Sequence, residues 1–260
     1  MPYLVEVCHL KAAARACMRR GGAAGADGMS WSEFRRGMQG RLDALAAELR
    51  AGTWQPSPVR EVVITTYTGK EFTAVIPTVA DRVVQRAMRN AIEPVLERRA
   101  LADWVSGYRA GRNRITALRD ADRHVAAGLR WVADVDVQQA SAGSSAQEIT
   151  GWLAAHVADG AFLALFQRVL EPLPYPIMPG TALSPMLINL RLSRVDTLLT
   201  GHPVVRFCDN YCIFARDRAV AEDAMADVVS VLGACGLTAH PGKSGIRRDV
   251  RTEDLFLIAG

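Results

Sequence analysis

Lysine is scarce in this chain, which has three lysines among 31 basic residues in a length of 260. The remaining positive charge is arginine, whose planar guanidinium group makes bidentate contacts with phosphate. A genome rich in G and C would also favour arginine codons, so this preference alone identifies no ligand. The net charge of +4 is mildly basic and excludes no class of partner.

Cysteine motifs and membrane segments are also missing. The five cysteines form no C-x-x-C pair, and their odd number without a secretory leader predicts reduced thiols in the cytoplasm. Cys208 and Cys212 could be a metal pair, but within a hairpin we expect them to pack as small apolar side chains. Because no apolar run is long enough to span a bilayer, we expect no membrane partner.

Two segments place carboxylates at the ends of expected strands. Polar and apolar residues alternate over 131–137, which puts Asp134 and Asp136 on one face of a strand. Further on, Asp209 and Asn210 form a turn-favouring pair between two apolar arms. Two carboxylates on adjacent strand ends can hold a divalent metal for phosphoryl transfer. Each aspartate could instead simply end or edge its strand, which is the interpretation we favour for Asp134.

Helical and extended patterns alternate along the rest of the chain. Helices are expected over about 5–20, 30–51, 79–99, 115–127, 144–157, 161–170, 184–199 and 219–235. A hairpin is expected over 59–76, and a final short strand over 255–258. This order predicts an α/β (α+β) fold, in which an antiparallel sheet is backed by helices on one face.

Several longer elements occur in one order along the chain. They are GADG at 25–28, WQPSPVR at 54–60, IPTVADRVVQ at 76–85, GYRAGR at 107–112, LSPMLIN at 183–189, FCDN at 207–210 and FLIA at 256–259. The series resembles bacterial reverse transcriptases, especially the group II intron-encoded type, and it runs almost end to end. The resemblance implies a polymerase fold of fingers and palm.

The resemblance also implies a division of the chain. Residues 1–130 correspond to the fingers with an N-terminal helical element, and one palm helix lies within 79–127. Residues 131–260 correspond to the palm. No helical thumb follows the palm before the chain stops, so we expect primer and template to be held weakly unless a partner chain or oligomerisation supplies one.

The same resemblance assigns roles to particular residues. Asp136 and Asp209 fall on the two metal-binding aspartates of the family, which implies Mg²⁺ or Mn²⁺ as cofactor. Asn210, beside them at the catalytic position, stands where the family has another aspartate and so removes one negative charge. Arg109 and Arg112, flanked by glycines, fall on a loop that holds nucleic-acid backbone.

Four further residues are candidates for substrate contacts. Arg82 and Lys243 are expected to contact RNA or an RNA–DNA duplex. Lys70 and Ala140 are expected near the nucleotide. Ala140 stands where the family has an aromatic ring against the sugar 2′ position, so it should leave space there and weaken discrimination against ribonucleotides.

Other features that handle the nucleotide are altered as well. Thr66 and Phe72 replace basic residues that clamp the triphosphate, although Lys70 remains close by. Losing two charge-assisted contacts should cost several kcal/mol, at roughly 1.5–3 kcal/mol each. The glutamine that precedes the LSP element in the family is also missing. Together with Asn210 and the missing thumb, these changes predict that templated DNA synthesis is weakened or lost.

Three hypotheses therefore remain open. The protein is a reverse-transcriptase-like enzyme with weakened metal-dependent nucleotidyl transfer, or it is a catalytically inactive scaffold of the same fold that binds nucleic acid or protein. A pure protein–protein scaffold would make the basic surface incidental. Intron mobility, antiphage defence and a domesticated host role are all compatible with the sequence.

Overall fold

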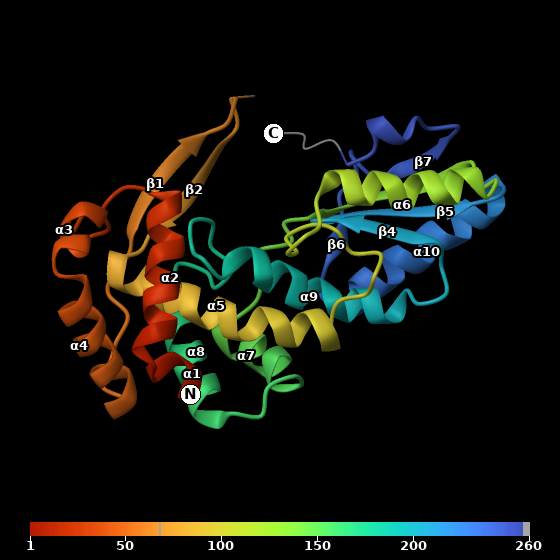
Figure 1. Cartoon of the computed structure of the whole chain (residues 1–260). Coiled ribbons are helices and arrows are strands. Elements are labelled where there is room, and N and C mark those ends of the chain that lie inside the picture. Colours follow the sequence, from red (N-terminus) through yellow and green to blue (C-terminus); the bar gives the residue numbers. More distant parts are fainter. Residues whose placement is uncertain (68, 257–260) are drawn as a thin grey trace. The chain divides into compact units, whose positions relative to one another are not determined.

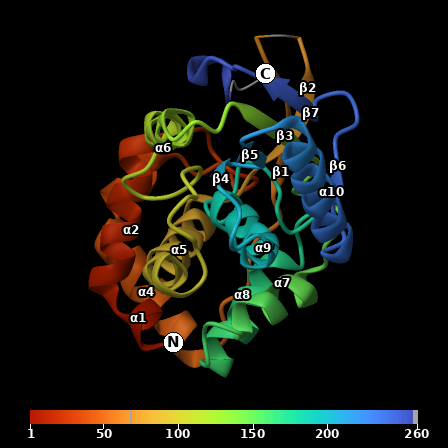
Figure 2. The ribbon, with the colours of Figure 1, turned by 90° about the vertical axis from the view of Figure 1, so that its right-hand side faces the viewer.

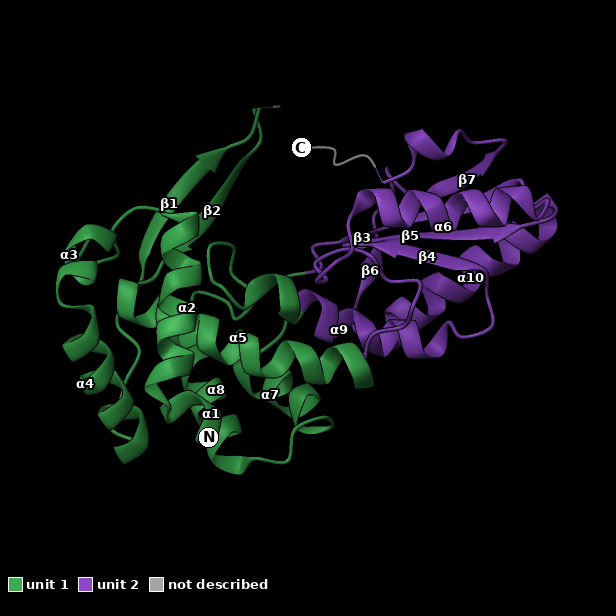
Figure 3. Cartoon of the chain, viewed as in Figure 1, with its two compact units in different colours: residues 1–99, 141–187, 260 green, residues 100–140, 188–259 purple. Residues whose placement is uncertain are grey.

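The computed structural model describes residues 1–67 and 69–256 and divides into two compact units (Figure 3). Unit 1 comprises residues 1–99 and 141–187, and unit 2 comprises 100–140 and 188–256 of the described chain. The chain therefore leaves and re-enters each unit. These contact-based units do not follow the predicted fingers–palm division at residue 130, which stays a prediction.

Unit 1 is mainly helical and carries one hairpin (Figure 1). Its helices are α1 (Pro2–Val5), α2 (Val7–Arg20), α3 (Trp31–Arg36), α4 (Met38–Ala51), α5 (Val79–Arg99), α7 (Ala146–Ala154), α8 (Gly160–Leu170) and the start of α9 (Ser184–Leu198). The antiparallel hairpin joins β1 (Arg60–Thr65) to β2 (Glu71–Ile76), as the sequence predicts.

The helix expected over 30–51 is broken into two. Ser30 and Glu33 form the expected capping box at the start of α3. Gly37 then leaves the helical region, with φ −120° and ψ 23°, and α4 begins at the next residue. Glycine has a low helix propensity because it loses the most backbone entropy on folding, so a break at Gly37 costs little, although Gly40 stays helical within α4.

Two of the elements that carry the resemblance hold the interior of unit 1 together. A Cβ added to Gly25 would lie 2.6 Å from Cα of Thr78, so the GADG and IPT segments meet backbone to backbone. Asp81 is buried and accepts hydrogen bonds from the Thr78 hydroxyl (2.7 Å) and the Ser57 amide (3.2 Å). These residues therefore have structural roles that the sequence motifs do not reveal.

Unit 2 is built on an antiparallel sheet. Its strands are β3 (Trp131–Gln138), β4 (Val204–Phe207), β5 (Asn210–Ala215), β6 (Thr238–Ala239) and β7 (Gly245–Arg248). The hydrogen-bonded order is β4-β5-β3-β6, and β7 also pairs with β3. The helices of this unit are α6 (Arg114–Ala126), the rest of α9, and α10 (Arg218–Ala234), with a 3-10 turn over Thr252–Asp254.

Helices cover both faces of this sheet (Figure 2). Val135 and Ile213 pack with residues of α9 and α10 in one core cluster, as the predicted sheet backed by helices requires. The alternate residues Val132 and Phe214 pack with α6 in a second cluster, on the opposite face. The predicted fold class is confirmed, and α6 adds a layer that the sequence pattern did not indicate.

The C-terminal strand expected over 255–258 is only partly within the described chain. Leu255 and Phe256 are buried but lie outside any strand. The rest of that segment, including most of the FLIA element, lies outside the described residues. No helix in the part of the chain that the structure describes is long and apolar enough to cross a membrane.

Candidate functional site

The sheet of unit 2 brings Asp136 and Asp209 to neighbouring strand ends. Asp136 of β3 lies opposite Asn210 of β5 in the strand register. One residue on, the Val137 amide donates to the Asp209 carbonyl at 3.0 Å. The expected hairpin is present, but Cys208 and Asp209 form its turn while Asn210 opens β5, and Cys208 adopts φ +56°. Asp209 therefore lies in the turn next to the end of β3, where its charge interacts with that of Asp136.

Charge and burial at this pair favour a cation. Burial raises the pKa of Asp209, the nearby charge of Asp136 raises it further, and Lys243 and Arg206 oppose that rise. The Lys243 ammonium lies 3.9 Å from Oδ2 of Asp136. Oδ1 of Asn210 is buried and has no hydrogen-bond partner in the described structure. An oxygen donor without a partner therefore belongs to the residue that lies opposite Asp136 and follows Asp209.

These donors fit one way in which proteins hold magnesium. Within residues 1–67 and 69–256, no group of three or more His, Cys, Asp or Glu side chains could hold an ion alone. Mg²⁺ in phosphoryl-transfer sites is typically held by one or two carboxylates together with substrate phosphates. Asp136 and Asp209, with the free oxygen of Asn210, match that mode, in which the substrate completes the coordination.

Neighbouring strands fix the backbone around Asp136. The His240 amide donates to the Asp136 carbonyl at 2.7 Å, and the Asp136 amide donates to the Ser244 hydroxyl at 3.2 Å. Asp134, on the same face, is buried and forms a 2.9 Å ion pair with Arg247. Burial raises the pKa of Asp134, and the Arg247 charge opposes the rise. The Asp134 carboxylate is therefore paired with Arg247 of a neighbouring strand, which agrees with its interpretation as a strand carboxylate.

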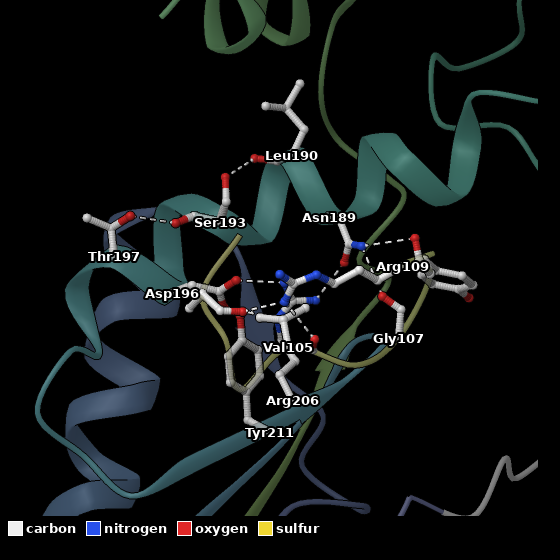
Figure 4. Close-up of polar contacts among 12 residues, drawn as sticks. Val105, Gly107, Arg109, Asn189, Leu190, Ser193, Asp196, Thr197, Arg206 and Tyr211 are labelled. Carbon is white, nitrogen blue, oxygen red and sulfur yellow. Dashed lines mark hydrogen bonds and ion pairs between the residues drawn. The ribbon is translucent and has the colours of Figure 1, made fainter. Parts of the chain in front are cut away.

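A buried polar network supports the turn that carries Asp209 (Figure 4). Arg206 of β4 is fully buried and binds both carboxylate oxygens of Asp196 on α9, at 3.0 and 2.6 Å. Its remaining contacts reach the Cys208 carbonyl at 2.7 Å and Oδ1 of Asn189 at 3.0 Å. The Tyr211 hydroxyl donates to Asp196 at 2.8 Å. One guanidinium therefore joins the turn that contains Asp209 to α9.

The glycine of the GYRAGR element meets the same turn. A Cβ on Gly107 would lie 1.9 Å from the Cys208 amide nitrogen, so only glycine fits. The side chain of Asn189 donates to the carbonyls of Gly107 (2.9 Å) and Tyr108 (3.3 Å). Sequence reasoning missed Arg206 and Asp196. The available signal for Arg206 was a single charge inside the apolar strand β4, since buried charges must be paired. Asp196 carried no comparable signal, because α9 also contains Arg191 and Arg194.

The arginines of the GYRAGR loop bind the loop's own backbone. Arg109 donates to the carbonyls of Ala102 (2.6 Å) and Val105 (3.0 Å). Arg112 donates to the Asp103 carbonyl and lies 3.7 Å from its carboxylate. Both guanidinium groups therefore brace the loop, and their predicted contacts with phosphate stay a prediction.

Three predicted residues are placed in settings that the sequence did not foresee. The Ala140 side chain is 4% exposed and belongs to the core cluster beneath the sheet, so no open space for a sugar is seen there. The side chain of Arg82 donates to the Ala23 carbonyl at 2.8 Å, and its guanidinium lies over the Trp31 ring. Lys70 is exposed next to the β1–β2 turn.

An antiparallel sheet with two aspartates at adjacent strand ends, backed by helices, is consistent with the palm of a polymerase. The chain belongs to the reverse transcriptase (RNA-dependent DNA polymerase) family, whose model matches residues 69–252. The predicted family is thereby confirmed.

The chain is also similar to two curated proteins. The chain is 28% identical over 193 residues to Protein YkfC of Escherichia coli (strain K12), covering 67% of this chain and 49% of that protein. It is 27% identical over 167 residues to Group II intron-encoded protein LtrA of Lactococcus lactis subsp. cremoris, covering 60% of this chain and 28% of LtrA. The chain thus matches half or less of the length of these relatives.

Proposed function

We propose that this protein binds RNA or an RNA–DNA duplex and transfers nucleotides to a primer at Asp136 and Asp209, with reduced efficiency. The observation that carries this proposal is the position of Asp136 on β3, opposite Asn210 with its unpartnered oxygen and next to the turn that contains Asp209. Membership of the reverse transcriptase family supports the same chemistry.

The side chains divide the reaction between them. Bound Mg²⁺ or Mn²⁺ would lower the pKa of the primer 3′-hydroxyl and stabilise charge on the leaving phosphates. Asp136 and Asp209 would hold that ion, and the carbonyl oxygen of Asn210 is a neutral third donor. Lys243, 3.9 Å from Asp136, supplies positive charge where phosphates arrive. Arg206 holds the Cys208 carbonyl and so fixes the turn.

Binding of the nucleic acid would depend on arginine. Arg109 and Arg112, with Arg82 and Lys243, are our candidates for contacts with the phosphate backbone, which carries no base identity. Lys70 is the candidate contact for the incoming triphosphate. A partner chain or a second copy of this chain is our candidate for further contacts with primer and template.

A second candidate function is a catalytically inactive scaffold of the same fold. The hairpin of unit 1 favours it, because Phe72 and Tyr67 are exposed apolar side chains near its turn, and Lys70 is the basic residue next to them. A triphosphate would find few cations there. The neutral Asn210 acts in the same direction by weakening metal affinity.

Primer extension separates the two functions. Purified protein is given a primed RNA template with Mg²⁺ or with Mn²⁺, and binding of the same duplex is measured in parallel. Nucleotide incorporation supports the enzyme. Binding without any incorporation in either metal supports the scaffold, and the absence of both binding and incorporation contradicts both proposals.

A further inference from the structure

Unit 1 carries a positively charged surface that the palm chemistry does not use. Arg35 and Arg36 end α3, and they line a hollow of about 560 Å³ together with Met18, Trp31 and Ser32. Arg19 and Arg20 end α2, directly after Met18. We call these four arginines and Trp31 the arginine patch.

The arginines of this patch lack carboxylate partners. All four are exposed, and among the described residues none of them has an Asp or Glu oxygen within 4.0 Å. The carboxylate nearest to them in sequence, Glu33, is held by the Ser30 amide and hydroxyl in the capping box. The positive charge here is thus not neutralised by an ion pair.

Several arginines of unit 2 form ion pairs with carboxylates. Arg123 pairs with Asp120 at 2.6 Å, and Arg218 pairs with Glu222 at 2.8 Å. Further pairs in that unit join Arg112 to Asp103, Arg130 to Asp249, Arg247 to Asp134 and Arg251 to Glu253. The arginine patch therefore differs from these paired arginines, although the exposed Arg119 and Arg216 of unit 2 also have no ion pair among the described residues. What distinguishes the patch is that its exposed arginines lie close to one another in sequence and beside Trp31.

Trp31 is held in a fixed orientation at this surface. The Arg82 guanidinium lies 4.9 Å from the ring centroid, Nε1 donates to the Gly21 carbonyl at 3.2 Å, and Phe34 packs edge-on at 5.9 Å. The indole is only partly buried and lines the hollow. An aromatic ring that is already ordered costs little entropy when a flat ligand packs against it.

We propose that the arginine patch binds single-stranded nucleic acid, with a base packed against Trp31 and phosphates at Arg19, Arg20, Arg35 and Arg36. Aromatic platforms beside basic side chains are the usual means of holding single strands without sequence preference. Arginine suits phosphate because its fork donates two parallel hydrogen bonds. This site lies within unit 1 and does not depend on metal or nucleotide chemistry at Asp136 and Asp209.

An acidic peptide would pair with the arginines of the patch but would not pack a flat group against Trp31. Carboxylates would pair with the arginines, yet they offer no flat face to Trp31. A nucleotide offers both groups at once, which is why we favour it. RNA and DNA strands share this chemistry, so both are included in the test.

The test measures binding of a fluorescent 12-nucleotide RNA or DNA strand to the full chain across a salt series. Arg35→Ala/Arg36→Ala should weaken binding at least tenfold and flatten the log–log salt slope by roughly 1.4 units, since each phosphate contact in a single strand contributes about 0.7. Arg123→Ala/Arg218→Ala removes the same charge from helices of unit 2 and should change neither quantity appreciably.

Base packing is tested with an abasic strand of equal length and charge. Wild type should bind the normal strand about tenfold more tightly than the abasic strand, and Trp31→Leu should remove this difference. Circular dichroism shows whether Trp31→Leu is folded. If it is not, the proposal is tested by the affinity of wild type for the two strands and by the Arg35→Ala/Arg36→Ala variant. Three results would overturn the proposal. They are the same loss of affinity in both double arginine variants, the same affinity of wild type for normal and abasic strands, and competition by polyglutamate as strong as that by nucleic acid. Loss of primer extension alone would leave it intact.

Discussion

Replacing Asp196 by alanine should destabilise the β4–β5 hairpin strongly. Arg206 and Asp196 are 0% and 1% exposed, and the substitution removes two hydrogen bonds to the guanidinium and the acceptor of the Tyr211 hydroxyl. A buried charge would remain without its counter-ion. Breaking such a buried pair from one side typically costs about 3–5 kcal/mol, a large part of the total stability of most domains.

Amide hydrogen exchange in β4 and β5 measures this loss without assuming that both units unfold together. Protection of these amides should fall by about two to four orders of magnitude in Asp196→Ala, at about 1.4 kcal/mol for each tenfold change. The double variant Arg206→Met/Asp196→Leu removes both charges. It should lose less protection than Arg206→Met and Asp196→Leu lose in sum, because the double variant leaves no isolated buried ion. A loss under about 1 kcal/mol in Asp196→Ala, or strict additivity in the double variant, would refute this reasoning.

Three other substitutions test the site and its supports. Gly180→Ala should cost at least about 2 kcal/mol in urea unfolding, because φ is +98° and the new Cβ would lie 2.0 Å from the Val75 carbonyl oxygen; unchanged stability would contradict this. Ala140→Phe should destabilise by about 1–3 kcal/mol through overpacking, without improving rejection of ribonucleotides in primer extension. A folded variant with a new deoxynucleotide preference would show that position 140 faces the sugar. Asn210→Asp should raise incorporation in Mg²⁺ severalfold relative to Mn²⁺, since it restores a negative charge; a fall in both metals would count against Asn210 as a ligand.

Much of the fold followed from local patterns. The alternation in β3, the turn-forming residues near Asp209 and the cap at Ser30 each act over a few residues, so the sequence alone predicts them. The turn itself lies one residue earlier than predicted, because Cys208 accepts a positive φ although it is neither glycine nor asparagine. Gly107 makes this geometry possible by leaving room for the Cys208 backbone, and that contact joins distant segments.

The features that the sequence did not predict depend on contacts between segments that are distant in sequence. Arg206 reads as an isolated charge in an apolar strand until α9 brings Asp196 to it. Likewise, the glycine-flanked loop suggests a phosphate contact for Arg109, but the sequence alone does not show that its guanidinium also binds the carbonyls of Ala102 and Val105. Ala140 is small enough to suggest open space, yet its side chain lies in the core. In each case the deciding partner lies outside the motif.

The most direct measurement is nucleotide incorporation on primed RNA by the wild type, Asp136→Asn, Asp209→Asn and the control Asp223→Asn. Asparagine keeps the shape of each side chain and removes the charge that would hold the metal, whereas Asp223 is exposed on α10. We predict weak incorporation by wild type and the control in Mg²⁺ or Mn²⁺, and a loss of at least a hundredfold in each of the other two variants. Incorporation that survives in both Asp136→Asn and Asp209→Asn would contradict the assignment of this site.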